Sequence, residues 1–157
     1  MMNRFLIFSF TLFAVIATGL TYAFLNGSSC RYSISLYVVE DDRHVFMTCY
    51  RGKVVALQTR QNEQGEILSK WKVEARHFRL SSQSIYFVYS RTPLVHGSRV
   101  DANDRFNEIS SGFKLLFYNM QRRGDKDVYI FQEFPRYYVH KGTIDGVLDA
   151  WDDTNQL

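Results

Sequence analysis

Two cysteines and four histidines are the side chains of this chain best suited to covalent or metal chemistry. Cys30 and Cys49 can join as a disulfide in an oxidising compartment, where such bonds form and persist. The alternative is a buried thiol at Cys49 and a free thiol at Cys30. The sequence leaves both open, because it does not show how close the two Cα atoms come. The histidines lack the spacing of metal ligands, so we predict no metal site. They are His44, His77, His96 and His140.

Three short segments resemble known functional motifs, but each match is incomplete or has a simpler structural explanation. The Arg-Gly-Asp tripeptide at 123–125 matches an adhesion motif, but Gly-Asp is also a favoured hairpin turn. Residues 101–104 begin like a calcium loop, yet Phe106 and Gly112 stand where that loop needs Gly and Glu. Ser110 and Ser111 lack the Gly-x-Ser-x-Gly elbow of a hydrolase. We therefore predict that the protein is not an enzyme and uses no cofactor.

The chain is rich in aromatic side chains, with 13 Phe, 10 Tyr and 2 Trp, and none of the motifs above accounts for them. Alternate residues of a strand face opposite sides, so an aromatic strand fills a core with one side and exposes the other. The exposed side could be covered by a partner or a ligand, or Tyr tips could simply reach water from a small core. The candidate partner or ligand face comprises Trp71, Phe78, Tyr86, Phe87, Tyr89 and Phe117.

The elements that must position these residues are short strands. From Arg31 onward the pattern has period two and is enriched in Val, Ile, Tyr and Phe, which is typical of β-strands. Apolar residues change parity within 67–80, which suggests a bulge or turn near Ala75. Asp101–Ile109 is a candidate short helix, with Asp101 or Asn103 as its N-cap. Seven or eight strands joined by short turns predict an antiparallel β-sandwich or small β-barrel.

The N-terminal segment Phe5–Leu25 contains no Asp, Glu, Lys, Arg or His. As a helix it spans roughly 30 Å, the thickness of a bilayer's hydrocarbon core. A cleaved signal is the alternative, but the apolar run exceeds the 7–15 residues typical of a signal core, so we favour an uncleaved anchor. Residues before Cys30 do not match a lipoprotein signal. The anchor residues include Phe5, Leu12, Ile16 and Leu25.

The predicted organisation follows from this anchor. Residues 1–4 form a basic cytoplasmic stub, and the positive-inside rule then places the remainder in the periplasm of a bacterial inner membrane. Residues 26–30 are a linker, 31–144 the β domain and 145–157 an acidic tail. Beyond Arg4 the chain carries 18 basic and 16 acidic residues, a near balance that does not suggest nucleic-acid binding.

Two segments support a resemblance to a known family. Residues 70–80 (KWKVEARHFRL) and 113–117 (FKLLF), behind one N-terminal span, resemble the FidL-like family of small enterobacterial inner-membrane proteins. They are more distantly similar to ToxS-type partners of membrane-bound transcription regulators. The resemblance implies a periplasmic domain that pairs with a regulator's periplasmic domain and tunes its signalling, in some cases around a hydrophobic ligand such as a bile salt.

Three functions remain in view. The first is a non-enzymatic accessory protein of the inner membrane that binds and modulates a bitopic membrane protein. The anchor favours it, since tethering two proteins in one plane raises their effective concentration. The second is a lipocalin-like module that binds a small hydrophobic ligand. The third is a secreted effector released after signal cleavage.

Overall fold

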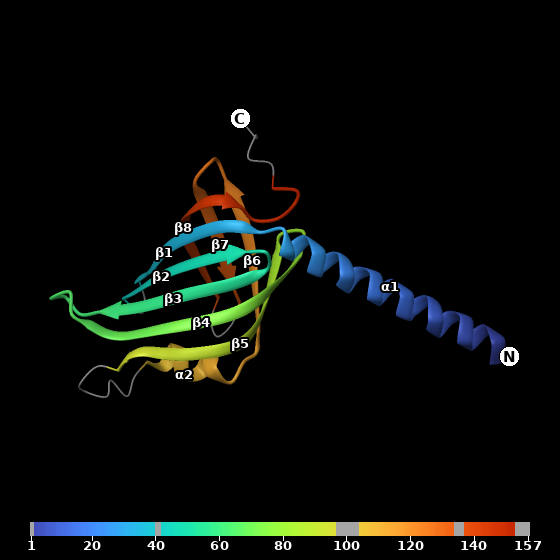
Figure 1. Ribbon diagram of the computed structural model, residues 1–157, viewed down its shortest axis with the longest axis horizontal. Coiled ribbons are helices and arrows are strands. Elements are labelled where there is room, and N and C mark those ends of the chain that lie inside the picture. Colours follow the sequence, from blue (N-terminus) through green and yellow to red (C-terminus); the bar gives the residue numbers. More distant parts are fainter. Residues whose placement is uncertain (1, 40–41, 97–103, 134–136, 153–157) are drawn as a thin grey trace.

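The computed structural model describes residues 2–39, 42–96, 104–133 and 137–152, and consists of one long helix followed by a β-barrel (Figure 1). The elements are α1 (Met2–Ser28), β1 (Arg31–Val38), β2 (Arg43–Tyr50), β3 (Lys53–Gln61), β4 (Ile67–Leu80), β5 (Gln83–His96), α2 (Arg105–Ser111), β6 (Leu115–Arg123), β7 (Asp127–Gln132) and β8 (Tyr138–Val147).

The strands form a closed up-and-down barrel in which each strand pairs antiparallel with the next, and β8 returns to pair with β1. The predicted antiparallel β fold is confirmed. Of the two architectures left open, a sandwich or a small barrel, the structure has the barrel. Closure depends on the pairing of Arg31–Leu36 with Gly142–Val147. A closed barrel has no edge strands along its paired segments, so those backbone groups are not left free to pair with other chains.

Helix α1 projects away from one end of the barrel, and its last turn packs on β4 (Figure 1). The Phe24 ring lies 5.8 Å from the Phe78 ring, and Asn26 Nδ2 donates a hydrogen bond to the carbonyl of Arg79 at 3.3 Å. Gly27 lies against the backbone of His77, where a Cβ atom would clash. The predicted linker at 26–30 is therefore mostly helix and part of the packed domain, because these small and polar residues suit close contact with a strand.

Within residues 67–80, apolar side chains move from odd to even positions, and the predicted cause was a bulge or turn near Ala75. Strand β4 is continuous, and the register shift opposite Glu74 and Ala75 comes from an extra residue, Tyr89, on β5. His77 on β4 is fully buried and Phe78 is turned outward onto α1. A bulge is thus present where β4 reaches Ala75, but it lies on β5. Its placement on β4 is wrong, because the prediction assumed that apolar residues face inward along the whole strand.

The chain end also differs from the predicted organisation. β8 continues to Val147, beyond the predicted domain boundary at 144, and Leu148 and Asp149 that follow are buried. Helix α2 overlaps the predicted range of 101–109 but runs on to Ser111, and its N-cap is Asp104, whose side chain accepts from Asn107 N. The two predicted N-cap residues, Asp101 and Asn103, lie outside the described residues, as does the end of the predicted acidic tail from 153 onward.

Candidate ligand-binding cavity

A cavity of about 510 Å³ lies within the barrel, toward the end that is distal to α1. This volume falls within the range of small-molecule sites in proteins. Both helix α2 and strands around the barrel contribute to its wall. Its lining comprises Leu36, Val38, Arg43, Val45, Met47, Val54, Ala56, Gln58, Val73, Ala75, Tyr86, Val88, Arg91, Ile109, Ser110, Leu116, Tyr118, Met120, Ile130, Gln132, Tyr138 and His140.

The cavity exists because small side chains face inward from two neighbouring strands. Val54 and Ala56 on β3 lie opposite Ala75 and Val73 on β4 in the strand register, and all four line the space. Alternation along each strand puts these residues on the interior face and their neighbours on the outside. Four small residues do not reach the centre of an eight-stranded barrel, so room remains for one small ligand.

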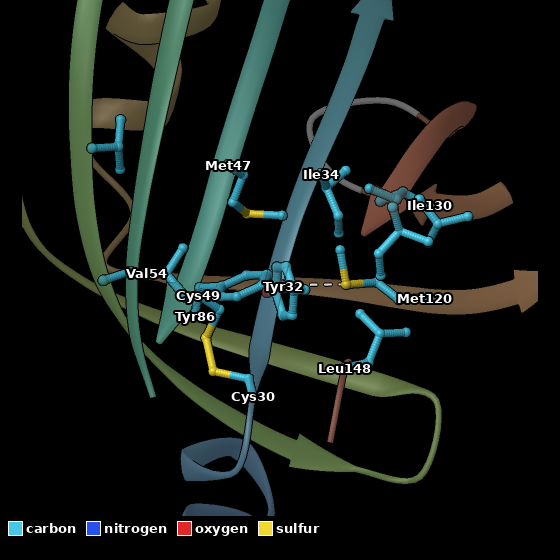
Figure 2. Close-up of a cluster of buried hydrophobic side chains, with 14 of the residues drawn as sticks. Cys30, Tyr32, Ile34, Met47, Cys49, Val54, Tyr86, Met120, Ile130 and Leu148 are labelled. Atoms are coloured by element: carbon cyan, nitrogen blue, oxygen red, sulfur yellow. Dashed lines mark hydrogen bonds between the residues drawn. A yellow bond between two sulfur atoms is a disulfide. The ribbon is translucent and has the colours of Figure 1, made fainter. Parts of the chain in front are cut away.

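The half of the barrel nearest α1 is filled by larger groups. Figure 2 shows the Cys30–Cys49 disulfide beside Tyr86 and Tyr32, with Met120 and Leu148 close by. The disulfide was one of two open alternatives, and the Cα atoms of the two cysteines lie 5.8 Å apart. These packed side chains separate the cavity from the end of the barrel that carries the helix.

His77 lies buried in this closed half, against the disulfide. Its Nε2 atom is 3.2 Å from Ser84 Oγ, and its Nδ1 atom is 3.9 Å from Cys49 Sγ. Burial, together with the positive charge of Arg79, lowers the His77 pKa to about 4, so the ring is neutral at pH 7. Cys30, Cys49 and His77 place three ligand atoms within 4.8 Å, but disulfide sulfurs are not the thiolates that a metal requires.

A buried ion pair ties the chain end to this closed half. Arg79 Nε pairs with the carboxylate of Asp149, and Arg79 Nη1 donates to Ser84 Oγ at 2.8 Å. Ser84 Oγ, which accepts from Arg79, is free to donate its own proton to His77 Nε2. The positive charge of Arg79 is thus compensated by Asp149, and the closed half has a connected polar network instead of a purely apolar core.

Tyr86 and Tyr118 line the cavity, and Tyr32 contacts Tyr86 without lining the cavity itself. The hydroxyls of Tyr32 and Tyr86 lie 2.9 Å apart, and the Tyr86 hydroxyl donates to Met120 Sδ at 3.2 Å. The Tyr118 ring lies 5.8 Å from the Tyr86 ring. Burial raises the pKa of Tyr118 to about 12, and burial also raises the pKa of Tyr32 and Tyr86. All three are therefore neutral at physiological pH and bring no charge to the cavity.

An ion pair at the distal end fixes helix α2. Arg43 Nη2 lies 2.5 Å from Asp104 Oδ1, and Ser69 Oγ donates to Asp104 Oδ2 at 3.0 Å. Burial by itself raises the Asp104 pKa, but hydrogen bonds from Arg43 and Asn107 outweigh it and hold that pKa below its ordinary value. The N-cap of α2 is thereby joined to β2 and β4 beside the cavity.

Arg91 enters the cavity wall because of the bulge at Tyr89. Ala75 pairs with Val88 and Glu74 with Ser90, so one residue of β5 has no partner on β4. An extra residue reverses the alternation beyond it, and Arg91 lines the interior together with Val88. Nε and Nη1 of Arg91 are buried and have no acceptor among the described residues.

The predicted partner or ligand face is divided between the two sides of the barrel wall. Tyr86 lies inside, and Phe78 is covered by Phe24 of α1. Trp71 is half-buried opposite Pro93 of β5. Phe87, Tyr89 and Phe117 are exposed on the outer surface, to 42%, 52% and 51%. The predicted anchor residues Phe5, Leu12, Ile16 and Leu25 are all exposed along α1.

Sequence reasoning missed the charged residues of the cavity. Arg43, Arg91 and His140 are interior residues of strands whose polar positions read as solvated. A signal existed for Arg91, because the run 85–89 has too many consecutive apolar residues for one uninterrupted alternation. Such a run is compatible with a bulge, which would move a later charged residue inward.

The geometry defines a class of protein: a closed, eight-stranded antiparallel barrel with an internal cavity, preceded by a helix long and apolar enough to cross a membrane. That helical stretch is Arg4–Ser28, with a mean hydropathy of 1.9, and a signal sequence meets the same criteria. Comparison with models of protein families finds no match, and comparison with curated proteins finds no significant match.

Proposed function

We propose that this protein is a membrane-tethered barrel that binds a small hydrophobic ligand in its internal cavity. The observation that carries the proposal is the cavity of about 510 Å³, whose lining is mostly apolar with a few polar groups. Ligand sites have this composition, since apolar walls supply binding energy and a few polar groups fix orientation. We propose binding and not catalysis.

The arrangement of the two barrel ends supports this function. The end beside α1 is packed with the disulfide and the Arg79–Asp149 pair, whereas the cavity lies toward the opposite end and contacts α2. With α1 in an inner membrane and the barrel in the periplasm, the cavity would lie away from the bilayer. A ligand would then enter from the aqueous side, past α2.

Photolabelling tests the proposal on the full chain in lipid nanodiscs. The probe is a neutral ten-carbon alcohol with a diazirine near its far end, and labelled residues are identified by peptide mass spectrometry. We expect label on cavity residues such as Met120 and Met47. Label on the exposed face of α1 reports probe dissolved in the bilayer and serves as the internal reference.

A pair of adjacent substitutions separates the cavity from the outer surface. Ala56→Phe fills the cavity, whereas Val55→Phe places the same side chain on the outside of the same strand. We expect A56F to reduce cavity labelling at least tenfold relative to α1 labelling, and V55F to leave it unchanged. Equal cavity labelling in A56F and the unaltered chain, or none in either, would refute ligand binding in the barrel.

A second candidate function is binding of a membrane protein partner, as the resemblance to FidL-like proteins implies. It rests on β5: β6 pairs with β5 only from Gln83 to Phe87, with one further hydrogen bond from Val88 N to Lys114 O. From Tyr89 to His96, no described strand pairs with this edge. An added strand from a partner would find free backbone groups there.

The outer surface beside this edge is apolar. Phe87 and Leu115 are register partners and both are exposed, with Tyr89 and Phe117 nearby on the same two strands. Exposed apolar groups that cluster in this way mark interaction surfaces. The function would then be that of an accessory protein which modulates a bitopic partner, such as a transmembrane transcription regulator.

In-cell crosslinking tests the second candidate. A photoreactive amino acid at position 89 should capture a specific bitopic membrane protein, whereas the same group at exposed Arg123, on the opposite end of the barrel, should not. Identical crosslinking patterns from the two positions would contradict a partner site at the β5 edge.

A further inference from the structure

The last turns of α1 belong both to the apolar stretch and to the packed barrel. Ala23 and Asn26 are buried, and the ring of Phe24 lies 5.8 Å from the ring of Phe78 on β4. Phe24 is the penultimate residue of the apolar run that ends at Leu25. With α1 in a bilayer, the barrel cannot stand clear of the membrane surface, because the helix packs on it before the apolar run has ended.

Helix geometry gives the depth of this end of the barrel. With Leu25 at the edge of the hydrocarbon core, Ser28 lies about 5 Å beyond it, at about 1.5 Å per residue along α1. The head-group layer on each side of a bilayer is about 5–7 Å thick. The turn between β2 and β3 packs on Ser28, where a Cβ atom added to Gly52 would lie 3.0 Å from Ser28 Oγ. This turn is therefore level with the lipid head groups.

Three arginines lie around the helix at this level. The guanidinium carbon of Arg76 is 5.6 Å from the centre of the Phe24 ring, and Arg76 Nη1 donates to the carbonyl of Arg51 at 3.2 Å. Arg51 itself follows Tyr50 in the turn, and its side chain is exposed, as is that of Arg31 at the start of β1. Among the described residues, none of the three guanidinium groups has a carboxylate partner.

The described carboxylates at this end are mostly engaged with other basic groups. Asp149, Asp152 and Glu74 are each held in an ion pair by a different basic side chain. Asp145 is exposed on β8, which pairs with β1, but it forms no ion pair with Arg31. In this part of the structure, one free carboxylate thus stands against three unpaired arginines, which leaves a net positive charge at the membrane surface.

Two of these arginines share a hollow of about 420 Å³ beside the end of α1. Arg31 and Arg51 line it together with Ser28 and Ser29, and side chains from 147–152 line the opposite side. A planar guanidinium presents paired N–H donors that match the oxygen atoms of a phosphate, and such charge-assisted hydrogen bonds are the stronger kind. The hollow therefore has the charge and the donors of a phosphate site.

We propose that this hollow binds the phosphate of an anionic phospholipid, with Arg31 and Arg51 as its ligands and Arg76 as an adjoining positive charge at the hydrocarbon boundary. The depth of the hollow identifies the source of the phosphate as a lipid, whose acyl chains would run beside α1. The proposal rests on the membrane tether of the proposed function but not on ligand binding in the cavity. A basic residue at an anionic membrane surface increases affinity by about fivefold.

Native mass spectrometry of the full chain in mild detergent tests the proposal. Dioleoyl phosphatidylglycerol and dioleoyl phosphatidylcholine have the same acyl chains, but only the first has a net negative head group. We expect the unaltered chain to bind phosphatidylglycerol about tenfold or more tightly than phosphatidylcholine, since two arginines contribute.

Substitutions assign the preference to the hollow. Arg31→Gln with Arg51→Gln should abolish it and leave phosphatidylcholine binding unchanged, whereas Arg31→Lys with Arg51→Lys keeps both charges and should retain part of it. Lys70→Gln with Lys114→Gln removes the same charge toward the distal end and should change neither. An unchanged midpoint of urea unfolding shows that each variant is folded.

A photoreactive amino acid locates the bound lipid in nanodiscs that contain the two lipids in equal amounts. Tyr50 and Phe46 both lie exposed on β2, and Tyr50 is the neighbour of Arg51. At position 50 we expect more adducts of phosphatidylglycerol than of phosphatidylcholine, and at position 46 few lipid adducts of either kind.

The outcomes separate this proposal from the proposed function. Equal affinity of the unaltered chain for the two lipids, or a full preference in R31Q/R51Q, would overturn the lipid site. Displacement of phosphatidylglycerol by sn-glycerol 3-phosphate at an equal concentration would assign the hollow to a soluble phosphate instead. Lipid adducts as abundant at position 46 as at position 50 would overturn its placement at the head groups. Cavity labelling by the diazirine alcohol should be the same in R31Q/R51Q, and its absence from all variants would refute ligand binding alone.

Discussion

Acid should destabilise the barrel through His77, and the effect can be isolated by one substitution. In the folded protein, the burial of His77 and the positive charge of Arg79 lower the pKa of His77 to about 4, compared with an ordinary value near 6.5. Between these two values the unfolded chain binds a proton that the folded chain does not. The free energy of unfolding therefore falls as the pH drops from about 6.5 toward 4, and the contribution of neutral His77 is fully present above pH 6.5.

The size of the effect follows from the difference in pKa. A difference of about 2.5 units at about 1.36 kcal/mol per unit corresponds to about 3 kcal/mol. His77 is fully buried, so solvent does not screen this contribution. That is a large part of the typical stability of a domain, and it should be visible well before most carboxylates are protonated.

The assay compares the unaltered chain with His77→Gln, in mild detergent, by urea unfolding followed by circular dichroism at pH 4 to 8. Gln keeps a hydrogen-bonding group near Ser84 but does not titrate. H77Q should be less stable at pH 7.5, and the difference between the two proteins should shrink by about 3 kcal/mol at pH 4. Other groups titrate alike in both proteins and cancel. Parallel pH profiles would refute a neutral, buried His77.

Three further perturbations have defined expectations. The Cys30–Cys49 bond links residues 19 apart in sequence, and its reduction should lower the free energy of unfolding by about 3 kcal/mol in the chain-entropy model. Urea unfolding with and without reductant measures this, and an unchanged midpoint would contradict it. Gly27→Ala should destabilise the contact of α1 with β4 by about 1–3 kcal/mol, whereas Gly19→Ala, with open space around it, should have no such effect on barrel unfolding. Asp104→Asn should remove the ion pair at the N-cap of α2 and lower the free energy of unfolding by about 1–3 kcal/mol. Hydrogen exchange of the α2 amides should become faster, and unchanged protection of α2 would show that the pair does not fix the helix.

The secondary structure was largely predictable from local patterns. Alternation in 31–38 and 128–134 predicts strands, and the turns around Gly52 and Gly124 lie where the hairpins turn, with positive φ at both glycines. Each of these signals resides in a few neighbouring residues. The boundaries were less accurate: β8 runs on to Val147, since pairing with β1 extends a strand through a polar sequence.

The cavity was not predictable in the same way. Its volume depends on small residues such as Ala56 and Ala75 that meet across two strands, and its charge depends on the bulge at Tyr89 that turns Arg91 inward. Arg79 and Asp149 are 70 residues apart in sequence and meet only when β8 has closed the barrel. Nothing in either local sequence indicates the other.

From the sequence alone came an apolar helix able to span a membrane, a mainly β domain and its antiparallel hairpins, because periodicity and turn chemistry are properties of consecutive residues. The tertiary structure decided that the sheet closes on itself, that Cys30 joins Cys49, and which face of each strand is inside. These outcomes depend on strand register, and a shift of one residue exchanges the inner and outer faces of a strand. For that reason the outward aromatics Phe87 and Phe117 and the inward Arg91 were distinguished only in the folded barrel.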